Sequence, residues 1–127
     1  QNLPKHVLVL RGSHEPGNTT ETFTFRDEVL SRFDVEVYDL FMEIFDAMPI
    51  SCNISKKYLA MHGGISPGLK QIDQINEIDR KQEIPLDGIF CDLMWADPMD
   101  DEEAVHGDFK ENPERDCSNY FGKKPVK

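Results

Sequence analysis

The clearest pattern in the chain is an apolar stripe with helical spacing in its second quarter. Its members recur every three or four residues, as on one face of an α-helix: Val37, Leu40, Phe41, Ile44, Phe45 and Met48. Asp34 precedes the stripe as an N-cap residue, Glu36 falls in the first turn, and Pro49 follows the last apolar position. We therefore predict a helix between Asp34 and Pro49 whose apolar face belongs to the core.

Short apolar runs predict strands in four places. Val7-Leu8-Val9-Leu10 is typical of a short buried strand, and Gly12 then lets the backbone turn. Residues 50–54 and 57–61 form two further runs around a polar turn at Ser55-Lys56, which indicates a hairpin. Residues 117–121 are the fourth candidate.

The remaining pattern predicts more helix. Phe25, Val29 and Phe33 are spaced by four residues, and Asn18 with Glu21 has the form of a capping box, which together predict a helix over 19–32. A short helix is expected over 69–78, while residues 89–94 fit either a helical turn or a short buried strand. The sequence contains no internal repeat and no linker long enough to divide it, which favours one domain spanning residues 1–127.

Composition narrows the class of protein. The 127 residues are 39% apolar and 30% charged, which suits a globular domain with a modest core. A net charge of −10 argues against nucleic acid and anionic membranes as partners. No apolar run approaches the ~20 residues of a membrane helix. With no signal peptide and three cysteines without a Cys-x-x-Cys pair, we expect reduced thiols in a cytoplasmic protein.

Two apolar runs end in a histidine beside glycine. Ser13 and His14 follow the first run, and His62 with its two following glycines comes after the run over 57–61. Two strands ending this way suggest a metal or phosphate centre at one edge of a sheet. The alternatives are a surface or capping histidine at 14 and a hydrogen-bonded turn histidine at 62. A serine hydrolase is disfavoured because adjacent strand residues point opposite ways and Gly-x-Ser-x-Gly is absent.

Three longer stretches carry a family resemblance. They are Arg-Gly-Ser-His-Glu at 11–15, His-Gly-Gly-Ile-Ser-Pro at 62–67 and Cys-Asp-Leu-Met-Trp-Ala-Asp-Pro at 91–98. In this order and spacing they resemble the metal-dependent serine/threonine phosphoprotein phosphatases, and the chain is most similar to the calcineurin catalytic subunit among them. The resemblance implies an α/β metallophosphatase sandwich, with mixed sheets flanked by helices and here incomplete, of which the chain is a middle segment. It also implies metal-assisted hydrolysis of phosphoserine and phosphothreonine.

The resemblance assigns roles to individual positions. His14 matches the general acid, Arg115 the arginine that binds the substrate phosphate, and His62 a metal ligand. Ser13 stands where the family has an asparagine metal ligand. An intact parent would hold two divalent or trivalent ions of iron, zinc or manganese and act on phosphoproteins. An EF-hand regulatory subunit and calmodulin would be its partners, bound through segments that these residues do not include.

Several features favour a second interpretation, a catalytically degenerate phosphatase-like domain with a structural or binding role in a larger assembly. The family's Asp-x-His and Gly-Asp-x-x-Asp-Arg-Gly ligand motifs do not occur in the sequence. Ser13 is a poorer ligand than asparagine, and Asp116 stands beside Arg115 where the family has glycine. An exposed Arg115 paired with Glu114 or Asp116 is the alternative to phosphate binding. We expect these residues alone to be inactive, even with Ser13→Asn, and the acidic stretch 97–103 to be a solvated loop.

Overall fold

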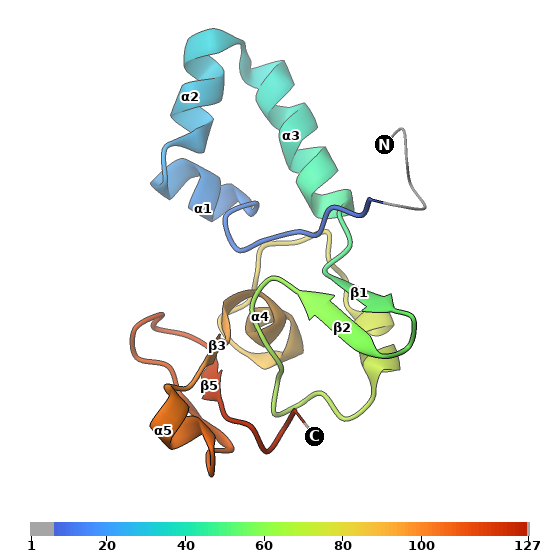
Figure 1. The fold of residues 1–127 in the computed structure, drawn as a ribbon. Coiled ribbons are helices and arrows are strands. Elements are labelled where there is room, and N and C mark those ends of the chain that lie inside the picture. The colour runs from blue at the N-terminus through green and yellow to red at the C-terminus, as the bar shows by residue number, and fades with distance from the viewer. Residues whose placement is uncertain (1–6, 127) are drawn as a thin grey trace.

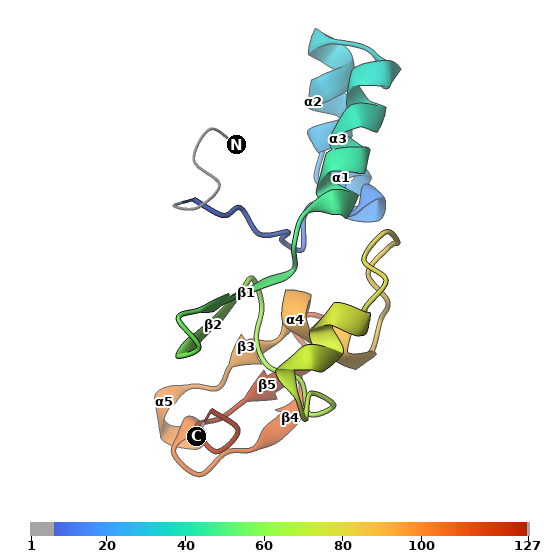
Figure 2. The same ribbon diagram turned by 90° about the vertical axis from the view of Figure 1, so that its right-hand side faces the viewer.

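The computed structural model describes residues 7–126 and shows a helical arm standing on a mixed α/β core region (Figure 1). The helical arm comprises α1 (Gly17–Thr22), α2 (Phe25–Arg32) and α3 (Val35–Ala47). The core region begins at residue 50 and contains β1 (Ser51–Ile54), β2 (Tyr58–Met61), the 3-10 helix η1 (Ile72–Glu77), α4 (Gly88–Trp95), β3 (Asp97–Pro98), α5 (Asp101–Ala104), β4 (Phe109–Glu111) and β5 (Asn119–Phe121). Figure 2 shows that the arm projects away from the core region.

Two small sheets flank α4. β1 and β2 pair antiparallel, and the N–H of Lys57 donates to the carbonyl of Ile54 (3.0 Å) to close the predicted turn. In the second sheet β5 lies between β3, to which it is parallel, and β4, to which it is antiparallel. The mixed sheets with helices confirm the predicted fold class and the hairpin, and β5 lies within the run predicted over 117–121.

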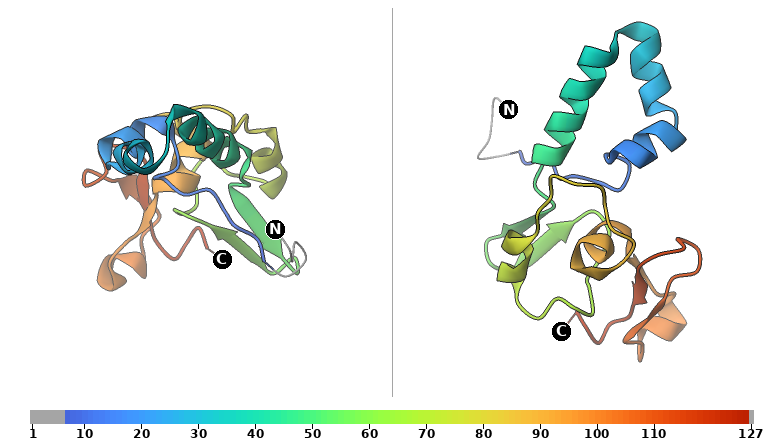
Figure 3. Two further views of the ribbon diagram at one scale, coloured as in Figure 1. Left: turned by 90° about the horizontal axis from the view of Figure 1, so that it is seen from above. Right: turned by 180° about the vertical axis from the view of Figure 1, so that it is seen from behind.

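Helix α4 supplies four of the seven buried residues of the hydrophobic core cluster, and in the right-hand view of Figure 3 its ribbon lies between the β1–β2 hairpin and β5. Leu93 and Cys91 have no exposed surface, and Met94 is 1% exposed. Ile50, Ile75 and neighbouring apolar side chains cluster around them. A helix that is apolar on nearly all sides must be buried all round, which resolves the ambiguity at residues 89–94 in favour of the helix.

The predicted helix after Asp34 is present as α3. The Asp34 carboxylate accepts from the N–H of Val37 (3.0 Å), as an N-cap residue does. Phe41 and Phe45 pack against the ring of Phe25 in α2, with centroid distances of 5.3 and 5.7 Å.

The apolar stripe of α3 is only partly core, contrary to the prediction. Leu40 and Ile44 are 57% and 58% exposed. The stripe is wide enough to face two neighbours, but α2 covers only the side that carries Phe41 and Phe45. Among the described residues nothing packs over the other side closely enough to bury it.

The single helix predicted over 19–32 is wrong, because two helices replace it. Thr24, between α1 and α2, has φ +67°, and this left-handed conformation interrupts a right-handed helix. The expected capping box is absent as well. Pro16 is the N-cap of α1, and the Asn18 side chain instead accepts from the N–H of Thr19 (2.6 Å).

The buried strand predicted at residues 7–10 is also wrong. This segment has no regular secondary structure, and Val7, Leu8 and Val9 are each about half exposed. A strand needs a hydrogen-bonded neighbour, and within residues 7–126 β1 is paired only with β2. At the next residue the N–H of Arg11 donates to Pro49 O (2.9 Å).

Two smaller differences concern the length of elements. The helix predicted over 69–78 is the shorter 3-10 helix η1, and the acidic stretch 97–103 contains β3 and the start of α5 rather than only loop. None of the helices in the described residues is long and apolar enough to cross a membrane.

Candidate functional site

Ser13 and His62 meet although 49 positions separate them in the sequence. The Ser13 side chain is 4% exposed, and its Oγ lies 3.1 Å from His62 Nε2. His62 directly follows the last residue of β2. The structure therefore brings together the two residues that the family resemblance assigned to metal binding.

Glycines hold this junction tightly against α4. The N–H of Gly63 donates to Leu93 O (2.8 Å), and a Cβ at Gly63 would lie 2.6 Å from the carbonyl carbon of Met94. Since real Cβ atoms do not come so close to backbone, the His-Gly-Gly loop can rest on α4 only with glycine here. The loop that carries His62 is thus fixed by the core region.

The His14 side chain is exposed, whereas the neighbouring Ser13 is buried. Its exposed ring stacks on Phe23 with a centroid distance of 4.4 Å and an interplanar angle of 19°. The Trp95 ring lies 6.4 Å away, tilted by 43°. Trp95 therefore lies beside the candidate general acid.

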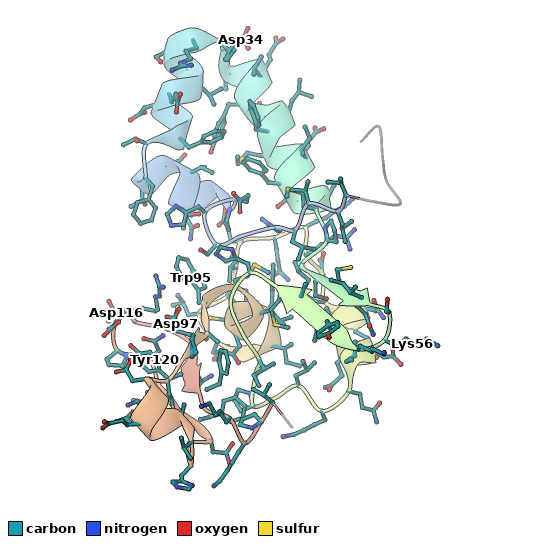
Figure 4. All side chains as sticks on the ribbon, viewed as in Figure 1. Asp34, Lys56, Trp95, Asp97, Asp116 and Tyr120 are labelled. Carbon is teal, nitrogen blue, oxygen red and sulfur yellow. The ribbon has the colours of Figure 1, made fainter. Side chains whose placement is uncertain are left out.

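Arg115 is held by Asp97 through two hydrogen bonds. Arg115 Nε donates to Asp97 Oδ2 (2.8 Å) and an Nη to Asp97 Oδ1 (3.1 Å). The alternative prediction, in which Arg115 pairs with Glu114 or Asp116, is correct about an ion pair but wrong about the acid, which is Asp97. Asp97 is 18 residues away, and the parallel pairing of β3 with β5 brings it to Arg115. Figure 4 shows Trp95, Asp97 and Asp116 on the same side of the molecule.

The ion pair changes the acidity of both groups. Hydrogen bonding from Arg115 lowers the pKa of Asp97, with a second contribution from Asn112, whose side-chain amide donates to the same carboxylate (2.9 Å). The pKa of the Arg115 guanidinium is raised, mainly by the hydrogen bond to Asp97. Arg115 also lies over the Trp95 ring at 5.8 Å from its centroid.

These contacts join the sequence-predicted residues into one continuous row. His62 contacts Ser13, which is bonded to His14; His14 faces Trp95, and Trp95 lies under Arg115. The row contains two candidate metal ligands, an imidazole and a guanidinium. The guanidinium can hold a phosphate ester, and the imidazole can protonate its leaving oxygen.

Asp92 ties the site loops to α4, a role that was not predicted from the sequence. Asp92 is 3% exposed and accepts from Ser66 Oγ (2.5 Å) and Ser118 Oγ (2.7 Å), and Asn119 Nδ2 donates to it at 2.9 Å. One carboxylate thus fastens both the loop after His62 and the loop after Arg115. The available signal was an acid inside the apolar run 89–94, since a buried carboxylate requires donors.

The role of Arg11 was also missed. Its side chain is 1% exposed, donates to Asp46 Oδ1 (2.8 Å) at the end of α3 and to the carbonyl of Arg80, and lies 5.9 Å from the centroid of Phe90. Arg11 therefore joins the helical arm to the core region, two residues before Ser13 in the sequence.

The described residues do not by themselves fit a two-metal centre. Among the side chains that the structure describes, no three or more of His, Cys, Asp or Glu come together so as to hold an ion. The Ser13 hydroxyl and the His62 imidazole supply two donors, one of them a weak neutral ligand. The role of both residues as ligands therefore stays a prediction.

Comparisons with known proteins agree on one family. The model of the calcineurin-like phosphoesterase family matches residues 1–127. Serine/threonine-protein phosphatase 2B catalytic subunit A1 of Saccharomyces cerevisiae is 40% identical over 122 residues, covering 89% of this chain and 22% of that protein. Subunit A2 of the same organism is 39% identical over 104 residues, covering 82% of this chain and 17% of that protein. The chain therefore spans about a fifth of the length of these relatives.

A solved structure is similar over nearly the whole chain. It is a protein serine/threonine phosphatase from Saccharomyces cerevisiae with similarity to human phosphatase PP5. The TM-score is 0.82 at 28% sequence identity, covering 95% of this chain and 36% of that one.

Proposed function

Because the chain belongs to the calcineurin-like phosphoesterase family, we propose that the protein carrying it is a serine/threonine protein phosphatase. The names of the relatives support this activity, since both matched curated proteins are phosphatase 2B catalytic subunits. The observation that carries the proposal is the continuous row from His62 and Ser13 through His14 to Arg115.

Each residue in the row has a chemical task in this proposal. His14 donates a proton to the serine or threonine oxygen that leaves the phosphorus, a role for which an imidazole is suited near neutral pH. Arg115 binds the phosphate oxygens with its planar donors. Because Asp97 occupies two of those donors, substrate binding requires that the phosphate share the guanidinium with Asp97 or displace it.

The family implies divalent metal ions, and we propose iron, zinc or manganese. Ser13 and His62 would contribute to their binding, but they do not complete a site, so no step of the reaction is assigned to a metal here. By similarity to phosphatase 2B the proposed partners are a phosphoprotein substrate, an EF-hand regulatory subunit and calmodulin. The free thiols of all three cysteines support a cytoplasmic location as a proposal.

The test measures phosphate release from a phosphoserine peptide in the presence of Mn²⁺ by the protein that carries this sequence. We expect His14→Gln to lower kcat by roughly 10²–10⁴-fold, the usual contribution of a general acid. His106→Gln is the matched control, since His106 is exposed and lies outside the row. Equal losses in both variants, or none in His14→Gln, would contradict the proposed role.

A second candidate function is a phosphatase-like domain that binds or supports other proteins without catalysis. The specific observation in its favour is that Asp97 already satisfies Arg115. The same assay separates the two functions. No phosphate release by the protein at any Mn²⁺ concentration, together with an intact fold, would favour the non-catalytic function.

A further inference from the structure

Phe23 is a large apolar side chain that the fold leaves mostly in solvent. It is 55% exposed and does not belong to the hydrophobic core cluster. Among the side chains that the structure describes, its one ring-to-ring contact is the stack on His14, with 4.4 Å between centroids and 19° between planes. Because an exposed side chain gains little from burial, burial alone does not account for where this ring lies.

The backbone adopts an unfavourable conformation directly after Phe23. Phe23 is the C-cap residue of α1, and its N–H donates to Thr19 O (2.9 Å). Thr24 then has φ +67°, a left-handed conformation that glycine takes readily and a β-branched residue rarely adopts. Strain of this kind is concentrated at functional sites. The turn at Thr24 ends α1 and fixes the backbone from which the Phe23 side chain extends.

The imidazole of His14 depends on this stack for its orientation. No hydrogen bond or ion pair holds the imidazole among the side chains that the structure describes. The Trp95 ring is 6.4 Å away and tilted by 43°, so it does not lie flat against the imidazole. An exposed side chain without such a contact exchanges between rotamers. The face of the Phe23 ring is therefore the contact that defines the plane of the imidazole.

We propose that Phe23 is a positioning residue for His14, whose ring holds the imidazole in the orientation from which it protonates the leaving oxygen. This role rests on the proposed phosphatase function. A general acid acts only within hydrogen-bond reach of the oxygen that it protonates, and a misplacement of about 1 Å can cost about 10²-fold in rate. Phe23 itself transfers no proton, so all of its effect passes through His14.

The first test is NMR spectroscopy of the 127-residue chain with labelled histidine, in which His14→Gln identifies the His14 signal. Protons over the face of an aromatic ring are shifted upfield. We therefore expect the ring-proton signals of His14 to move downfield in Phe23→Leu and to stay upfield in Phe23→Tyr. Phe33→Leu is the matched control, because Phe33 is 61% exposed in the same arm and does not stack on His14. An unchanged His14 signal in Phe23→Leu would overturn the inference.

The second test measures phosphate release from the phosphoserine peptide by the protein that carries this sequence. We expect Phe23→Leu to lower kcat by up to about 10²-fold with little change in KM, since it disturbs proton transfer and not substrate binding. Phe23→Tyr keeps the ring and should restore kcat. Because Phe23 is mostly exposed, both variants should fold. Phe33→Leu should behave as the parent protein does.

A double-mutant cycle shows whether Phe23 acts through His14. Phe23→Leu should cost nothing further when His14→Gln is already present, because the group that Phe23 positions is then gone. Equal further losses in both backgrounds would show a merely structural role and overturn the inference. Full activity of Phe23→Leu beside an impaired His14→Gln would also overturn it and leave the proposed function standing. A parent protein that releases no phosphate would overturn both.

Discussion

The helical arm and the core region differ in how completely they bury their apolar side chains. In α4 the side chains of Leu93 and Met94 are at most 1% exposed, whereas Leu40 and Ile44 in α3 are more than half exposed. The core region therefore supplies most of the hydrophobic stabilisation of the described chain, since that stabilisation scales with the apolar area removed from water.

The difference also explains where the candidate site residues are fixed and where they are not. His62 and Arg115 lie on loops that Asp92 ties to α4 through Ser66, Ser118 and Asn119. His14 instead stacks on Phe23, which comes between two helices of the arm. His62 and Arg115 are thus held by the well-packed core region. The position of His14 depends on the less well-packed arm.

Truncating one leucine in each region is the strongest way to test this comparison. We expect Leu93→Ala to lower the free energy of unfolding by about 2–5 kcal/mol, because it leaves a cavity in the core. Leu40→Ala, the same change in the arm, should alter it by less than about 0.5 kcal/mol because the side chain is exposed. Urea denaturation followed by tryptophan fluorescence of Trp95 measures both. Similar losses would mean that the arm is as well packed as the core region.

The junction between the two regions can be loosened at Asp46. Asp46→Ala leaves the buried Arg11 guanidinium without its anion, which costs about 1–3 kcal/mol. The same change also removes an acid from the last turn of α3, where the helix dipole disfavours a negative charge, and this raises the free energy of unfolding by about 0.3–1 kcal/mol. The net loss should therefore be at most about 2.7 kcal/mol, and about 1.4 kcal/mol at the middle of both ranges.

Amide hydrogen exchange shows which region of the Asp46→Ala variant loses stability. We expect faster exchange in α1, α2 and α3 of Asp46→Ala than in α4, because Arg11 connects the arm to the core region. Glu43→Ala is the control, since it removes an exposed acid from the same helix. Uniform acceleration in both regions would show that the arm does not open separately.

The ion pair of the core region should give stability that depends on pH. The pKa of Asp97 is lowered from its ordinary value of 3.8 by Arg115. The pair therefore stabilises the fold above that value, and its contribution is lost as the pH falls through the lower pKa of the folded chain. Because the Arg115 side chain is 45% exposed, solvent screening should limit the contribution to less than about 1 kcal/mol.

Asp97→Asn tests this dependence. The difference in unfolding free energy between the parent chain and Asp97→Asn should be largest near neutral pH and shrink between about pH 5 and about pH 2. Asp100→Asn, a change of an exposed acid two residues beyond β3, serves as the control. A difference that stays constant over this range would mean that the carboxylate charge contributes nothing.

Local chemistry made some of the fold predictable from the sequence. Asp34 before a helical stripe and Ser55-Lys56 between two apolar runs act over a few residues, and both predictions are confirmed. The break at Thr24 was not predictable, because residues 19–32 contain no glycine or proline to mark it. The strand expected at 7–10 failed because a strand depends on a partner and not on its own residues.

For the candidate site, the roles of the residues stay predictions, and the structure shows only which of them lie together. The family resemblance identified Ser13, His62 and Arg115, and the first two do meet. Their partners depend on contacts between residues far apart in the sequence. Asp97 reaches Arg115 only because β3 and β5 are parallel neighbours, and no local pattern encodes that arrangement.

The smallest expected effect concerns the β1–β2 hairpin, whose stability within the core region depends on its turn. Ser55 and Lys56 have φ +55° and +57°, a two-residue turn of the kind that asparagine and glycine favour. We expect the double change Ser55→Asn with Lys56→Gly to raise the free energy of unfolding by about 0.5–1 kcal/mol, since each replaced side chain is strained in the left-handed region. Lys57→Gly is the matched control and should give no gain, because Lys57 is outside the left-handed positions. Urea denaturation measures the gain only if the hairpin unfolds together with α4. An unchanged urea midpoint, with slower amide hydrogen exchange confined to β1 and β2, would show that the hairpin opens independently. The cooperative part of the core region would then be smaller than the comparison assumes.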